Sequence, residues 1–127
     1  MASQFLTDIT STILSKTLDA AAARQKTISN NIANVETPGY KRRFVSFEDE
    51  LKEILDRPSG HGVRAGIGNL TPVCQTDEAS PGRPDGNNVN IDAEIADLAK
   101  NSLQYKAAAI LLEGKGAMLR SAIMGGK

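Results

Sequence analysis

Apolar side chains recur at alternating intervals of four and three residues in two long stretches, one near each end of the chain. This spacing places them in one stripe along an α-helix, as at the a and d positions of a coiled coil. The first stretch predicts a helix over about residues 3–35. Its stripe is apolar except at Gln25 and comprises Leu14, Leu18, Ala21, Gln25, Ile28, Ile32 and Val35.

The second stretch predicts a helix over about residues 90–124. Asn90 is a suitable N-cap, and Asp92 and Glu94 put negative charge in the first turn, where the helix dipole favours it. Gly114 and Gly116 each cost a helix interior about 1 kcal/mol relative to Ala, so we expect another helix to approach closely there. The stripe comprises Ile91, Ile95, Leu98, Ser102, Tyr105, Ala109, Leu112, Gly116, Leu119 and Ile123.

The segment between these helices, residues 36–89, has a different pattern. Thr37-Pro38-Gly39-Tyr40 predicts a type II turn, and Asn34 just before it is a reasonable helix terminator. Residues 44–55 read as a short extended piece leading into a short amphipathic helix. Residues 58–86 hold four of the five Pro and six of the 11 Gly. They predict a long irregular loop, with a weak β-hairpin around residues 66–73.

The predicted fold is mainly α. Neither terminal helix can bury its stripe alone, so the economical arrangement pairs them, antiparallel or nearly so, as a coiled-coil-like core. The chain is then a single structural domain in three parts, 1–35, 36–89 and 90–127. Narrow stripes leave other faces free, so we expect these residues to pack other subunits too; a dimeric bundle would show the same periodicity. The packing residues are Leu14, Leu18, Ile28, Ile32, Ile91, Ile95, Leu98, Tyr105, Leu112 and Leu119.

Composition excludes several classes of protein. The 127 residues carry a net charge of +0, against the basic excess of most nucleic-acid binders. The only cysteine, Cys74, cannot form an internal disulfide, and with His61 it leaves few ligands for zinc. No apolar run reaches the roughly 18 residues of a membrane span. The first basic residue is Lys16, so we expect no cleaved secretory signal, and either a cytosolic protein or one exported without cleavage.

No catalytic motif emerges, so the sequence predicts a protein that is not an enzyme and needs no cofactor or small-molecule substrate. His61 and Cys74 lack partner residues at a useful spacing, and their roles stay open. The carboxylates of the short middle helix read as a solvated face mixed with basic residues. They are Glu48, Asp49, Glu50 and Glu53.

A basic triplet, residues 41–43, is flanked by Tyr40, Phe44 and Phe47, three of the chain's five aromatics. Such a cluster can stack on single-stranded nucleic acid, but the acidic run that follows argues against this. Aromatics and Arg are also enriched at protein interfaces. The third interpretation is that the aromatic rings fold back onto the first helix.

Residues 28–41 resemble the N-terminal signature of the bacterial flagellar axial proteins, which form rod, hook and junction. Residues 85–105 are similar to the C-terminal half of the proximal rod subunits in that family. One match lies toward each end of the chain. The signature residues at the helix end and turn are Asn30, Asn31, Asn34, Thr37, Pro38, Gly39 and Tyr40.

The resemblance implies a structural subunit of the proximal rod of the flagellar basal body, which polymerises helically around the export channel and transmits torque. It implies four kinds of partner: other copies of the chain, other rod proteins, the ring-to-rod adaptor protein and the export gate. The implied location is the rod across the periplasm, reached by flagellar type III export with an uncleaved N-terminus. Phe5 and Ile9 resemble the gate-recognition pattern. The alternative is a small coiled-coil adaptor that binds one partner helix.

Overall fold

The structure, a computed structural model, describes residues 2–58 and 62–125, with side chains from residue 9 onward. Two long helices bracket a smaller middle region, as predicted. The fold is therefore mainly α. In chain order the elements are α1 (Ala2–Ala33), β1 (Arg43–Ser46), α2 (Glu48–Leu55), α3 (Val63–Asn69), β2 (Val73–Thr76) and α4 (Ile91–Ile123).

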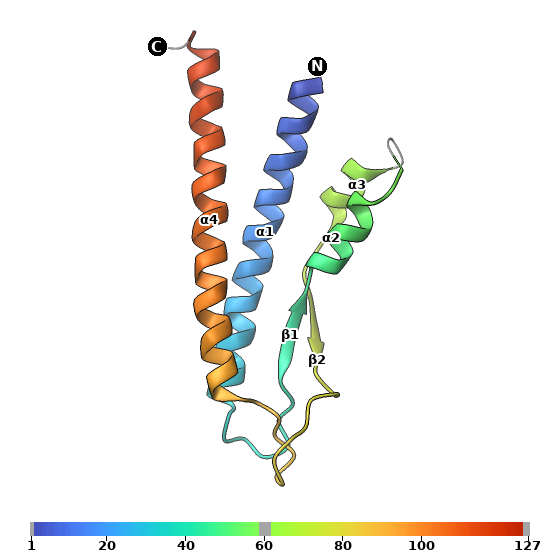
Figure 1. The fold of residues 1–127 in the computed structure, drawn as a ribbon, viewed down its shortest axis with the longest axis vertical. Helices are drawn as coiled ribbons and strands as arrows, with labels where there is room; N and C mark the ends of the chain where they lie inside the picture. The colour runs from blue at the N-terminus through green and yellow to red at the C-terminus, as the bar shows by residue number, and fades with distance from the viewer. Residues whose placement is uncertain (1, 59–61, 126–127) are drawn as a thin grey trace.

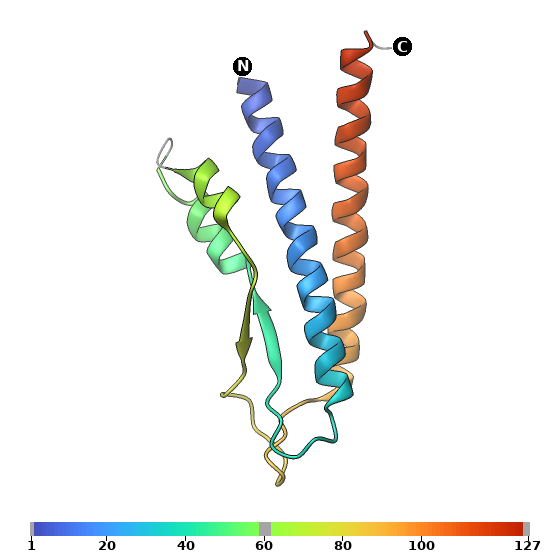
Figure 2. The same ribbon diagram turned by 180° about the vertical axis from the view of Figure 1, so that it is seen from behind.

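The two long helices run antiparallel, which confirms their predicted pairing. They converge where α1 ends and α4 begins, and they separate toward the chain termini, which lie at the same end of the molecule (Figures 1 and 2). The middle region lies on the other side of α1 from α4. One face of α1 therefore contacts α4, and another contacts the middle region.

The side of α4 toward α1 carries small and polar residues at seven-residue intervals. Glu94, Asn101 and Ala108 are its buried residues. The predicted apolar stripe of α4 lies beside this contact, with Ile95 53% exposed and Leu119 48% exposed. Polar residues decide which side of α4 faces α1. Glu94 and Asn101 each hydrogen-bond to α1, and buried polar groups must have such partners.

The predicted packing residues have different surroundings in the two helices. In α1, Ile28 is buried, and Leu14, Leu18 and Ile32 are half-buried. In α4, only Leu98 and Leu112 are half-buried. The remaining four, which are the exposed residues of the set, are Ile91, Ile95, Tyr105 and Leu119.

The apolar core lies between α1, α2 and α3. Ala20 leaves room on α1 for Phe47, which is 2% exposed and packs with Ile54, Ile67 and Leu70. Strands β1 and β2 continue the middle region as a two-stranded antiparallel sheet, in a register that runs from Arg43 opposite Thr76 to Ser46 opposite Val73. The predicted extended piece and short helix correspond to β1 and α2.

The segment 58–86 differs from its prediction. It contains helix α3 and strand β2, so it is not one long irregular loop, and the hairpin expected around residues 66–73 is wrong. Strand β2 pairs instead with β1, about thirty residues earlier in the chain. Gly66 permits α3 to pack closely on α2, because a Cβ there would lie only 3.0 Å from the Ile54 side chain. Glycine thus marks a close helix contact here.

Candidate functional site: the polar junction at the helix ends

The end of α1 and the turn after it have the expected local geometry. The helix stops at Ala33, and Asn34 donates from its backbone and its side chain to the carbonyl of Asn30. Gly39 has φ 73°, and the Tyr40 amide donates to the Thr37 carbonyl at 3.2 Å. These features confirm the predicted type II turn, because its third position requires a positive φ.

Asn87 holds this turn from the other side. Its side chain is fully buried, and Nδ2 donates to the carbonyls of Asn34 (2.9 Å), Val35 (3.1 Å) and Thr37 (2.8 Å). Its Oδ1 accepts from the Val89 amide at 2.8 Å. Each of these carbonyls also accepts from a second donor: the Thr37 amide for Asn34, Arg83 for Val35 and the Tyr40 amide for Thr37. Asn87 therefore ties three carbonyls of the turn together and adds a buried donor to each.

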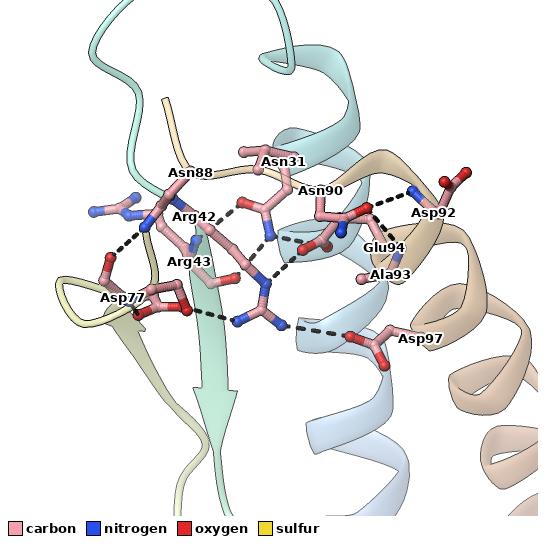
Figure 3. Close-up of polar contacts among 12 residues, drawn as sticks. Asn31, Arg42, Arg43, Asp77, Asn88, Asn90, Asp92, Ala93, Glu94 and Asp97 are labelled. Carbon is pink, nitrogen blue, oxygen red and sulfur yellow. Dashed lines mark hydrogen bonds and ion pairs between the residues drawn. The ribbon is translucent and has the colours of Figure 1, made fainter. Parts of the chain in front are cut away.

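Asn31, one of the predicted signature residues, joins three elements. It is fully buried, and its Nδ2 donates to the Arg43 carbonyl at 2.8 Å and to Glu94 Oε2 at 3.1 Å. Its Oδ1 accepts from the Arg43 amide at 3.0 Å and from the Tyr40 hydroxyl at 3.2 Å. Every hydrogen-bonding position of this amide is used, which links α1 to β1 and α4 (Figure 3).

A buried ion pair lies next to Asn31. Glu94 is 0% exposed, and its Oε1 accepts from Arg42 Nε at 2.5 Å. The same guanidinium lies 3.4 Å from Asp97 and 3.6 Å from Asp77, so three carboxylates surround it (Figure 3). Losing one partner of such a pair leaves an uncompensated buried charge, which costs several kcal/mol. The pair therefore helps to fix α4 against the start of β1.

The surroundings of the junction keep Arg42 charged, the Tyr40 hydroxyl protonated and Asp77 ionised. Burial opposes the charge of Arg42, but the hydrogen bond with Glu94 and the three carboxylates outweigh it, so the pKa of Arg42 rises. Burial raises the pKa of the Tyr40 hydroxyl, which stays protonated as a donor to Asn31. The pKa of Asp77 is lowered by hydrogen bonds from Ser80. These groups form a structural network.

The members of the basic triplet have separate roles. Lys41 Nζ donates to the Gly86 carbonyl at 2.7 Å, and Arg42 belongs to the junction, while Arg43 is exposed. Phe47 packs on Ala20, and Phe44 lies with its ring 6.0 Å from the Arg42 guanidinium carbon. For Phe47, folding back onto α1 is therefore the correct interpretation.

Sequence reasoning missed three members of the junction. No pattern points to Asn87 or to Asn88, whose Oδ1 accepts from the Arg42 amide at 2.5 Å and whose Nδ2 donates to the Asp77 carbonyl at 2.7 Å. Both lie in the segment that resembles the family, just before the N-cap of α4. The sequence predicts Glu94 only as a negative charge near the N-terminal end of the helix dipole. The one signal in the sequence is the position of Glu94. It lies four residues after Asn90 and therefore on one definite side of the first turn of the helix, where a buried residue can lie. Its partner Arg42 is 52 residues away, which no local pattern reveals.

Other predicted residues lie away from the junction. Ile9 packs against the apolar core, and the side chain of Phe5 lies outside the described residues. Cys74 is exposed on β2 with Sγ 3.9 Å from Thr27 Oγ1, and His61 also falls outside the described residues. Across residues 2–58 and 62–125 no three His, Cys, Asp or Glu are grouped to hold a metal ion. No helix in that part of the chain has the length and apolar content to cross a bilayer.

Comparison with known proteins gives one consistent family. The family model described as "Flagella basal body rod protein" matches residues 13–41. The flagellar basal body rod protein FlgB of Bacillus subtilis is 33% identical over 120 residues, covering 90% of this chain and 92% of the relative. FlgB of Escherichia coli is 34% identical over 113 residues (77% and 80%), and FlgB of Salmonella typhimurium is 31% identical over 123 residues (86% and 88%).

Proposed function

This chain belongs to the FlgB flagellar basal body rod proteins and is a structural subunit of the rod, and we propose that it polymerises helically around the export channel at the proximal end. The family is a structural one whose members are not known as enzymes. The coiled-coil adaptor is not favoured, because the relatives are rod proteins and the similarity to them covers most of each chain.

The observation that carries the proposal is the distribution of apolar side chains around α4. Besides the side toward α1, a second stripe is formed by Leu103, Ile110, Leu111 and Met118, which are 59–73% exposed. An α-helix turns by about 100° per residue, so Leu103 and Ile110 lie on nearly the opposite side from Asn101 and Ala108, and Leu111 and Met118 lie about a quarter turn away from that contact. A helix that is apolar on all sides is normally surrounded by protein.

In the part of the chain that the structure describes, α1 is the only helix that packs extensively against α4. The exposed stripe continues into the half of α4 that separates from α1, where Leu119 and Ile123 are also exposed (Figure 1). Burying apolar area is worth about 25 cal/mol per Å², so neighbouring helices would gain stability by covering this surface. We propose that these neighbours are other copies and other rod proteins.

The same reasoning favours an open assembly. A contact between two different surfaces of identical subunits, when its rotation does not close a ring, generates a helical filament. The two sides of α4 carry different residues, so a contact between them on neighbouring copies would join two different surfaces. Stacked in this way, the long helices would form the wall of a tube and carry torque along it.

The position of Ile9 bears on export. In the folded chain Ile9 packs against the core beside α2 and α3. It is therefore free for recognition only while the chain is unfolded, as type III export requires. We propose that Phe5 and Ile9 are read by the export gate before folding, that the N-terminus is not cleaved, and that the subunit then joins the rod across the periplasm, next to the ring-to-rod adaptor.

A charge placed in the exposed stripe tests the assembly. Ile110→Asp should leave the monomer folded, because the side chain is 67% exposed, and should prevent rod formation and motility in cells that lack their own copy. Val73→Asp is the control, since Val73 is also exposed but lies on β2. Folding is checked by circular dichroism of both variants. Normal rods and swimming with Ile110→Asp would refute the proposal.

A further inference from the structure

A polar groove opens between α1, β1 and α4, beside the junction. Its volume is about 370 Å³. Both α1 and β1 contribute basic residues to the groove. Helix α4 contributes Asp97, Lys100, Asn101 and Gln104. The charged residues that line the groove are Arg24, Arg42, Arg43, Glu48, Asp97 and Lys100.

Two of the cations in this groove are unpaired. Arg24 pairs with Glu48, and Arg42 pairs with Glu94 and Asp97. Neither Arg43 nor Lys100 makes an ion pair with any residue in the described ranges, and both are exposed. The groove therefore presents two free positive charges at its edges, from β1 and from α4.

An unsatisfied acceptor also lines the groove. Asn101 is 3% exposed and uses Nδ2 to donate to the Ala21 carbonyl at 2.8 Å. Its Oδ1 is buried and accepts no hydrogen bond within the described part of the chain. Buried polar atoms in folded proteins nearly always have a partner. The groove is thus suited to an occupant that brings carboxylates together with a donor.

Helix α2 presents that chemistry on its outer side. Asp49 and Glu53 are one helical turn apart, and Asp56 follows one turn later, directly after the helix. We call these three residues the acidic ridge. They are exposed, point away from the side on which Ile54 is buried, and form no ion pair among the described residues. Lys52 lies beside the ridge and supplies a donor.

We propose that the acidic ridge of one copy binds in the polar groove of the next copy. Carboxylates of the ridge would pair with Arg43 and Lys100, and Lys52 would donate to the free oxygen of Asn101. Within one chain the ridge faces away from the core that fixes α2 to α1, so it is directed at a neighbour. The contact joins two different surfaces, as an open helical assembly requires. This inference rests on the proposed self-assembly and adds a contact outside the terminal helices.

Charge reversal tests the contact. Lys100→Glu and Glu53→Lys should each lower the association constant, measured by sedimentation at rising protein concentration, by roughly 10–100-fold. A chain that carries both changes should recover much of the loss, because the reversed charges again attract. The controls are Lys106→Glu and Glu78→Lys, which change exposed residues outside the groove and the ridge. Circular dichroism checks that all variants fold.

Mixing the two single variants makes the test sharper. The Glu53→Lys chain keeps an intact groove and the Lys100→Glu chain keeps an intact ridge, so together they should form a pair that cannot extend through this contact. A carbodiimide should then couple the carboxylates of the acidic ridge to the amine of Lys100, the one lysine that lines the groove, and only between chains. Isotope-labelled mixtures analysed by mass spectrometry reveal such links between chains. If the two single variants associate as strongly as the wild type and the control variants, this contact alone would be overturned. A wild-type chain that never associates would overturn the proposed self-assembly as well.

Discussion

Asn87 shows how a single buried amide can organise the junction. Three carbonyls beyond the end of α1 converge on its Nδ2, and its Oδ1 holds the segment that leads into α4. A shorter side chain cannot reach them, and water has little access to a fully buried position. The connection between the two long helices therefore depends on this residue.

Asn87→Ala should lower the free energy of unfolding by about 1–3 kcal/mol, because the several hydrogen bonds made by its buried amide are lost together. Urea unfolding followed by circular dichroism measures the change. Asn30→Ala is a suitable control, since Asn30 is exposed on α1. A loss no greater in Asn87→Ala than in this control would show that the turn is held by other contacts.

Asp77 should make stability depend on acid pH. Hydrogen bonds from Ser80 lower the pKa of its carboxyl in the folded chain below the ordinary value. A lowered folded pKa adds stability above the unfolded pKa, and that stability is lost as pH falls through the folded pKa. Asp77→Asn should therefore flatten the acid side of the stability profile, measured by urea unfolding between about pH 2 and 7. An unchanged acid side would contradict this role.

At this scale the sequence predicts what is local and misses what is distant. Pro38 and Gly39 reveal the turn because the required φ values belong to those residues themselves. Asn90 likewise caps α4 as expected, accepting from the amides of Asp92 and Ala93. The ion pair of Arg42 with Glu94 joins residues 52 positions apart and depends on how α4 is rotated. No local pattern contains that information.

At the scale of elements, the helices follow from periodicity but their rotation does not. An apolar stripe shows that α4 exists, yet α4 carries apolar residues on several sides. The choice of the side toward α1 is made by Glu94 and Asn101, whose hydrogen bonds must be satisfied. Helix α3 and strand β2 were missed for a similar reason. The two glycines of α3 resemble loop signals, and the partners of α3 and β2, which are α2 and β1, lie elsewhere in the chain.

Gly114 and Gly116 should oppose stability and support assembly. A Cβ at either position would meet no atom within 4 Å in the single chain. Gly114→Ala and Gly116→Ala should each stabilise α4 in the monomer, by up to about 1 kcal/mol, as measured by thermal unfolding. If neighbouring helices approach there, the same changes should reduce rod formation in cells. Stabilised variants that build normal rods would contradict a close approach.

Gly39→Val tests the turn as an element. Its Cβ would have room, but a β-branched residue resists φ 73°. We expect normal expression with impaired rod assembly and reduced swimming on soft agar. Gly68→Val is a control at a glycine with open space and no positive φ. Equal swimming in both variants would argue against the turn as the determinant.

At the scale of the whole molecule, the described elements form two arms joined at one end. The polar junction holds the end of α1, β1 and the start of α4 together, and the helices separate toward both termini (Figure 2). The charged groove lies beside the junction, while the exposed apolar stripe runs along α4. The exposed stripe is thus separate from the residues that hold the subunit together, while the groove shares Arg42 and Asp97 with the junction.

A density map of isolated basal bodies, resolved to side chains, tests the central claim most directly. We predict this chain at the proximal end of the rod, with α1 and α4 in the wall around the channel. The stripe of Leu103, Ile110 and Met118 should be covered by helices of neighbouring subunits. A map in which the chain is absent from the rod, or in which that stripe faces solvent, would contradict the account.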